Sequence, residues 1–150
     1  MSDLRELYRS VILDHNKKPR NLGEPEGANR SADGFNPLCG DKVTVYLTVE
    51  EDAVKDAGFT GSGCAISMAA ASLMTESIKG KTVGEVERLF DGFQELVTAD
   101  SETKDESGGL GKLAVFSGVR EFPMRVRCAT LPWHAMRAAL QQSAETVTTE

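Results

Sequence analysis

Three cysteines, spread widely along the chain, set the strongest limit on what this sequence can fold into. Each lies beside glycine, proline or another small residue, in the stretches 36–41, 61–64 and 127–132. A cysteine that only packs is usually embedded in an apolar run, because a neutral thiol behaves as a small hydrophobic group. Asp41 closes the sequence Cys39-Gly40-Asp41. The pattern predicts three thiolates and a carboxylate converging on one ion, as four-coordinate zinc prefers.

The residues alone leave a second interpretation open, in which the three cysteines are independent. The sequence contains no compact Cys-x-x-Cys pair, so the evidence for a metal is weaker than in a zinc ribbon. Cys64 stands where a helix is expected to begin, and the unpaired N–H groups of a helix start favour thiolate. Arg125 and Arg127 should favour thiolate at Cys128. Asp41 also suits a turn or a backbone cap.

Length and charge limit the class of protein. A chain of 150 residues is long enough for one hydrophobic core without covalent staples. The net charge of −6 argues against a general nucleic-acid binder, which would carry a basic excess. We find no apolar run approaching the roughly 20 residues of a membrane span, and no signal-peptide segment. We therefore expect a cytoplasmic protein with reduced thiols and no membrane or nucleic-acid partner.

The hydrophobic pattern of the first half predicts an α+β fold. Residues 3–15 have helical spacing, residues 16–37 form an irregular arm, and residues 42–50 alternate as a half-buried strand does. Residues 54–60 are expected to pair with that strand through a turn near Glu51 and Asp52. Because two strands alone are marginal, we expect a third, from the arm around Gly34 and Phe35.

Helices are expected in the second half. A helix over residues 64–79 should end at Gly80, and a capping box from Thr82 to Glu85 should begin the next. Residues 100–109 read as a mobile loop and residues 110–119 as a short helix. Pro132 suits the first turn of a final helix through Ala144, followed by a frayed tail over residues 145–150.

The chain resembles the U-type iron–sulfur cluster assembly proteins, the IscU-like family, over nearly its whole length. The resemblance lies in the flanks of the three cysteines and in two N-terminal stretches: Leu7-Tyr8 through Asp14-His15, Lys18-Pro19-Arg20-Asn21, Cys39-Gly40-Asp41, Gly63-Cys64-Ala65-Ile66-Ser67 and Arg127-Cys128-Ala129-Thr130-Leu131. It implies one domain over residues 1–150. The implied fold is that of the IscU/NifU N-terminal domains, a three-stranded antiparallel sheet packed against several helices.

Two departures place the resemblance in the SufU branch. IscU-type scaffolds carry a Leu-Pro-Pro-Val-Lys chaperone motif and a histidine just before the third cysteine, whereas this chain has no such motif and has Arg127 at that position. Arginine stays protonated and cannot ligate a metal. The chain also carries extra sequence over residues 105–119, as SufU-like proteins do between the second and third cysteine motifs.

The SufU resemblance implies a zinc-dependent sulfurtransferase. Cys39, Asp41, Cys64 and Cys128 match the zinc ligands, and Cys39 matches the residue that accepts sulfur as a persulfide. The implied partners are a SufS-type cysteine desulfurase and a SufB-type scaffold complex. The alternatives are a scaffold that assembles a [2Fe–2S] cluster on the same ligands, and a zinc-stabilised module that activates its partner without carrying sulfur.

Other polar and aromatic residues near the cysteine motifs have simpler interpretations beside functional ones. Arg125 and Arg127 are either a docking site for the desulfurase or solvated surface charges. His134 is expected to pack or lie at the surface rather than bind metal. Trp133 is either a partner anchor or a core residue.

Overall fold

The structure is a computed structural model that describes residues 2–36, 40–98, 123–141 and 147–148. Its elements in chain order are α1 (Ser2–Lys17), β1 (Arg30–Asn36), β2 (Asp41–Glu50), β3 (Ala53–Ser62), α2 (Ala65–Ile78), α3 (Val83–Thr98), α4 (Pro123–Leu140) and β4 (Val147–Thr148). The expectations for residues 99–122, including the loop, the short helix and the extra sequence over 105–119, lie outside the described residues.

The sheet has the strand order β3-β2-β1-β4, with β1, β2 and β3 antiparallel. The alternation predicted for β2 is confirmed, because Val43, Val45 and Leu47 are buried on the face that the helices cover. Glu51 and Asp52 form the two-residue turn between β2 and β3, both with positive φ (53° and 64°), as a type I′ hairpin requires. The hairpin of β2 and β3 therefore follows directly from the pattern of the chain.

The expected third strand is confirmed as β1, which occupies the end of the stretch assigned to an irregular arm. Within residues 16–37 the structure places the end of α1, then residues 18–29 without helix or regular strand, then β1. This middle part is fixed to α2: the Ser72 hydroxyl accepts the Arg20 N–H at 2.7 Å and contacts His15 Nδ1 at 2.7 Å. The Lys-Pro-Arg-Asn stretch is thus held against α2 by hydrogen bonding and has a structural role.

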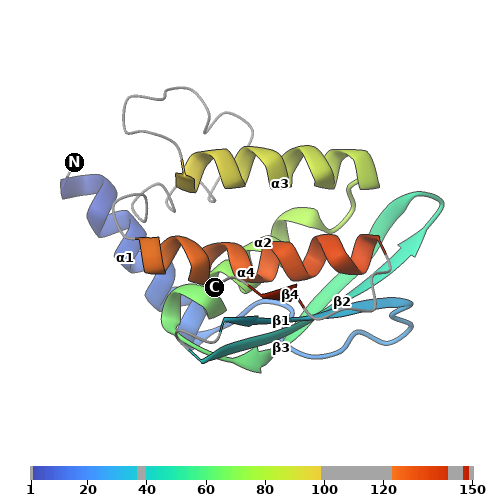
Figure 1. Cartoon of the computed structure of the whole chain (residues 1–150), viewed down its shortest axis with the longest axis horizontal. Coiled ribbons are helices and arrows are strands. Elements are labelled where there is room, and N and C mark those ends of the chain that lie inside the picture. Colours follow the sequence, from blue (N-terminus) through green and yellow to red (C-terminus); the bar gives the residue numbers. More distant parts are fainter. Residues whose placement is uncertain (1, 37–39, 99–122, 142–146, 149–150) are drawn as a thin grey trace.

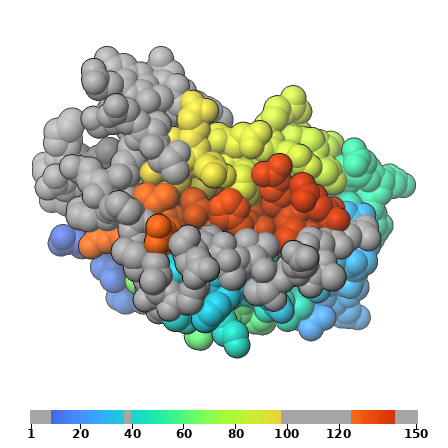
Figure 2. Space-filling view, viewed as in Figure 1, coloured from blue at the N-terminus to red at the C-terminus, as the bar shows by residue number. Residues whose placement is uncertain are grey.

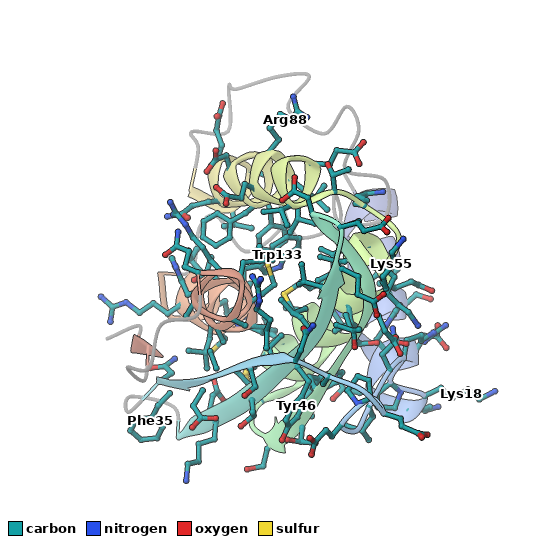
Figure 3. The ribbon with its side chains drawn as sticks, turned by 90° about the vertical axis from the view of Figure 1, so that its right-hand side faces the viewer. Lys18, Phe35, Tyr46, Lys55, Arg88 and Trp133 are labelled. Atoms are coloured by element: carbon teal, nitrogen blue, oxygen red, sulfur yellow. The ribbon has the colours of Figure 1, made fainter. Side chains whose placement is uncertain are left out.

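Helices cover one face of the sheet in two layers (Figure 1). α2 and α4 lie against the sheet, α3 lies on the far side of them, and α1 packs beside α2. Figure 2 shows α3 and α4 side by side on one surface of the molecule. Aromatic contacts join α3 to α4: Trp133 of α4 stacks on Phe93 of α3 with ring centroids 4.7 Å apart. Trp133 is 1% exposed and is therefore a core residue (Figure 3).

The predicted start of the last helix is wrong. α4 begins at Pro123, so Pro132 lies inside the helix rather than in its first turn. Pro132 cannot donate the usual hydrogen bond to the Cys128 carbonyl. Burial of the helix offsets that loss: a Cβ at Gly34 of β1 would lie 3.0 Å from Leu131, which shows how closely α4 approaches the sheet.

The expectation of a frayed tail over residues 145–150 is also wrong for two of its residues. Val147 and Thr148 form β4, which pairs in parallel with Gly34 and Phe35 of β1. The pairing supplies main-chain hydrogen-bond partners along the edge of β1, which an unpaired edge strand would lack. A tertiary contact of this kind leaves no periodic signal in so short a segment.

Candidate metal and thiol site

Two cysteines and an aspartate meet where the β1–β2 hairpin, the start of α2 and the first half of α4 come together. The carboxylate of Asp41 and the sulfur atoms of Cys64 and Cys128 all lie within 4.8 Å of one another. Three of the four residues predicted to converge are therefore brought together. Cys39, the fourth, lies outside the described residues.

Asp41 is held by the main chain of α2. It is the first residue of β2 and has no exposed surface. Its Oδ1 accepts the N–H of Cys64 at 2.8 Å, while its Oδ2 lies 3.7 Å from Cys64 Sγ. Asp41 thus caps a backbone amide and also stands in the position of a ligand. Its Oδ1 orients the carboxylate, and its Oδ2 faces the sulfur of Cys64.

Gly63 is what allows this approach. A Cβ at Gly63 would lie 2.6 Å from Asp41 Oδ1 and 3.1 Å from Asp41 Cβ, so any larger residue would displace the carboxylate. Gly63 is therefore needed because only a residue without a side chain leaves room for the Asp41 carboxylate beside Cys64.

Cys64 is the N-cap of α2. Its backbone is extended (φ −71°, ψ 166°), and its sulfur accepts the N–H of Ser67 at 3.4 Å, as an N-cap side chain does. The pKa of Cys64 is lowered to about 7, chiefly because the Cys128 thiol donates a hydrogen bond to it. The Ser67 N–H adds to this shift, and together these donors outweigh burial. The expected thiolate at the start of a helix is therefore supported.

Cys128 was expected to precede a helix, but it lies within α4. It is only 3% exposed. The side-chain Nδ2 of Asn36, at the end of β1, donates to Cys128 Sγ at 3.8 Å. Asn36 is a site residue that the sequence interpretation missed. Its signal was its place on the buried side of β1, where the other inward residues are Ala32 and Gly34.

The remaining candidates lie around or away from the cluster. Arg125 is exposed and Arg127 half-buried, both on α4 beside Cys128. His134 packs against Phe90 of α3 with ring centroids 5.3 Å apart, as expected for a packing residue. The pKa of His134 is lowered, first by burial and then by the nearby Arg137 charge.

Across the described ranges, we find no helix that is both long and apolar enough to cross a membrane.

The donor set fits a thiophilic divalent metal. Two sulfur atoms and one carboxylate oxygen are ligands that zinc accepts, and a fourth ligand would complete a tetrahedron. The same atoms also suit iron in a cluster. When bound, zinc would hold the thiols deprotonated without changing redox state. The geometry thus supports a metal centre that suits zinc or iron.

Comparison with known proteins identifies the family of the chain. The model of a family described as the NifU-like N-terminal domain matches residues 7–129. The chain is 42% identical over 137 residues to the zinc-dependent sulfurtransferase SufU of Bacillus subtilis (strain 168), covering 90% of each protein. It is 36% identical over 144 residues to the iron-sulfur cluster assembly scaffold protein IscU of Streptococcus pyogenes serotype M1, covering 96% of this chain and 89% of that protein.

The fold gives the same result. A crystal structure described as a candidate iron-sulfur cluster assembly scaffold for the SUF system of Fervidobacterium islandicum AW-1 superposes with a TM-score of 0.80. It is 34% identical in sequence, and the match covers 90% of this chain and 97% of that one. This chain therefore belongs to the NifU-like N-terminal domain family, among the IscU and SufU homologues of iron–sulfur cluster assembly.

Proposed function

We propose that the chain is a zinc-dependent sulfurtransferase, which accepts persulfide sulfur from a SufS-type cysteine desulfurase and passes it to a SufB-type scaffold complex. The observation that carries this proposal is the convergence of Asp41, Cys64 and Cys128. The similarity to a zinc-dependent SufU protein supports it. Such chemistry requires reduced thiols, so we place it in the cytoplasm.

Cys39 is the proposed fourth ligand and sulfur acceptor. The Asn36 carbonyl accepts the Gly40 N–H at 2.8 Å, and Asn36 pairs with Asp41 across the β1–β2 hairpin. Consecutive Cα atoms lie about 3.8 Å apart, so covalent connectivity keeps the Cα of Cys39 within about 7.6 Å of that of Asp41. Cys39 therefore belongs to the chain segment that leads into the cluster.

The transfer step is a thiol exchange. The Cys39 thiolate attacks the outer sulfur of the persulfide on the desulfurase. A new S–S bond forms as the S–S bond of the partner breaks, and the partner cysteine leaves as a thiolate. Cys39 then carries the persulfide, and no external oxidant or reductant is consumed.

Metal analysis and intact mass spectrometry test this proposal together. We expect the purified protein to hold zinc, and to gain the mass of one sulfur atom on the peptide containing Cys39 after incubation with desulfurase and cysteine. Cys39→Ser should abolish the mass gain, whereas Cys64→Ser should first of all lower the zinc content. Sulfur found only on Cys128 would overturn the assignment of the acceptor. Desulfurase activation without sulfur gain would favour an activating module.

A cluster scaffold is the second candidate, because the S. pyogenes relative is named as one and the donor set suits iron. Anaerobic incubation with ferrous iron and sulfide separates the two functions. A stable [2Fe–2S] spectrum that requires Asp41, in a protein that gains no persulfide, would favour the scaffold.

Arg125 and Arg127 are the proposed docking residues for the desulfurase. They give the site a positive rim on a chain whose net charge is −6. Reversing both charges should slow association and weaken its salt dependence while zinc content stays unchanged. The matched control is Lys55→Glu with Arg88→Glu, because Lys55 lies near the opposite end of β3 from Gly63 and Arg88 lies on α3 (Figure 3). Equal effects of the two double variants would rule out a specific docking role.

A further inference from the structure

We propose that Asn36 is a positioning residue, whose side-chain amide donates an N–H to the sulfur of Cys128 and holds that sulfur toward the site. The inference rests on the proposed function, since it concerns how this chain holds one of its zinc ligands in place.

The need for such a donor follows from the position of Cys128. It lies beyond the first turn of α4, where the main-chain N–H groups are already used by the helix. It is also 3% exposed, so water supplies little solvation. Cys64 has a main-chain donor in the Ser67 N–H, whereas the donor that reaches Cys128 from β1 is the side chain of Asn36.

Asn36 has the geometry to be that donor. Its Nδ2 lies 3.8 Å from Cys128 Sγ, within the range of an N–H···S hydrogen bond, and joins residues 92 positions apart in the sequence. Asn36 itself has no exposed surface. Burying an amide is costly unless its hydrogen-bonding groups are used. Packing alone would be satisfied by an apolar residue, as it is at Ala32 on the same side of β1.

The same residue also fixes the end of the hairpin that carries Asp41. Its carbonyl accepts the Gly40 N–H at 2.8 Å, and its strand partner is Asp41. Asn36 therefore connects the hairpin that carries Asp41 with the helix that carries Cys128. A donor placed outside the ligands in this way orients them and offsets part of their negative charge.

Asn36→Asp is the sharpest variant, because it keeps the shape of the side chain and replaces the donor by an acceptor. We expect a 10- to 100-fold loss of zinc affinity in competition with a chromophoric chelator, the usual effect of losing such a contact. The sulfur-to-cobalt charge-transfer band of the cobalt-substituted protein should shift as well. Asn36→Leu removes the donor without adding charge and should show the same changes to a smaller extent.

Asn29→Asp is the matched control. Asn29 also donates from its Nδ2, at 2.9 Å to the Val49 carbonyl, but at the other end of the hairpin. We expect it to alter thermal stability and to leave the zinc affinity and the cobalt spectrum unchanged. If the Asn36 variants bind zinc as the wild type does, or lose no more affinity than Asn29→Asp, the inference is wrong.

A measurement on the unaltered protein makes the test independent of how the variants fold. With an NMR-active cadmium isotope in place of zinc, the Asn36 side-chain N–H should show a coupling to the metal through Cys128 sulfur. Absence of that coupling, where other N–H···S couplings are seen, overturns the inference. A wild-type protein that binds no zinc at all would instead overturn the proposed function.

Discussion

Cys64 and Cys128 bring sulfur to the same site from two differently built regions. Cys64 is half-buried and opens α2, where its sulfur accepts a main-chain N–H and its own N–H holds Asp41. Cys128 is buried within α4, and the amide side chain of Asn36 donates to it. The start of α2 therefore relies on main-chain groups that most substitutions leave in place. The α4 side relies on a side chain that one substitution removes.

Gly63→Ala should break the α2 side most strongly. The added Cβ would lie 2.6 Å from Asp41 Oδ1, so the carboxylate has to leave its position. We expect a 10- to 100-fold loss of zinc affinity, measured by chelator competition, and about 1–3 kcal/mol of lost unfolding free energy from overpacking.

Gly84→Ala is the control for that substitution. Gly84 lies in α3, and a Cβ there meets no atom within 4 Å. Alanine in a helix stabilises by up to about 1 kcal/mol relative to glycine. We therefore expect equal or higher stability and unchanged zinc affinity. An equal loss of affinity in both variants would show that Gly63 has no special relation to Asp41.

Cys64→Ala should have a medium effect in the metal-free protein, because it removes the N-cap of α2. We expect the free energy of unfolding to fall by about 1 kcal/mol in urea titrations with chelator and reductant present. Cys64→Ser keeps a capping oxygen and should lose much less. Similar losses for the two variants would argue against capping by this side chain.

Comparison of the wild type with Cys64→Ser should also show a pH dependence of the free energy of unfolding. The pKa of Cys64 is lowered in the folded state from 9.0 to about 7, so the folded protein binds fewer protons in this range than the unfolded chain. The stabilisation is fully present above pH 9 and is lost as pH falls through about 7. The wild type should therefore gain stability over Cys64→Ser between pH 7 and pH 9. A constant difference would contradict a stabilised thiolate.

His134 should show the smallest effect and separates the far half of α4 from the site. Its pKa is lowered below 6.5 by burial and by Arg137, so the folded state favours the neutral ring. Stability from this residue is complete above pH 6.5 and is lost as pH falls below it. His134→Gln should flatten the stability curve below pH 6.5 and leave zinc affinity unchanged. A change in zinc affinity would mean that both halves of α4 serve the site.

Local patterns predicted the parts of the molecule that local physics controls. The alternation of β2, the capping box at Thr82 and the helix starting after Cys64 are all confirmed. Each depends on residues within a few positions of one another. The convergence of Asp41, Cys64 and Cys128 was one of two interpretations that the residues left open, and the resemblance to the IscU-like family favoured it.

Features that depend on contacts between distant segments were not predictable in the same way. Pro132 looks like a helix start, but packing of α4 on β1 carries the helix through it. Asn36 looks like a turn residue, although its place on the buried side of a strand was a usable signal. The pairing of β4 with β1 left no pattern in the sequence.

The order in which the site closes during folding follows from the separation of its parts along the chain. The contact of Asp41 with Cys64 spans 23 positions, and that of Asn36 with Cys128 spans 92. The longer loop is two doublings longer, which adds about 1.2 kcal/mol to the entropy cost of closure. The half formed by β2 and α2 can therefore assemble while α4 is still undocked. A complete set of ligands exists only once the last helix has joined, so metal retention reports that the chain has finished folding.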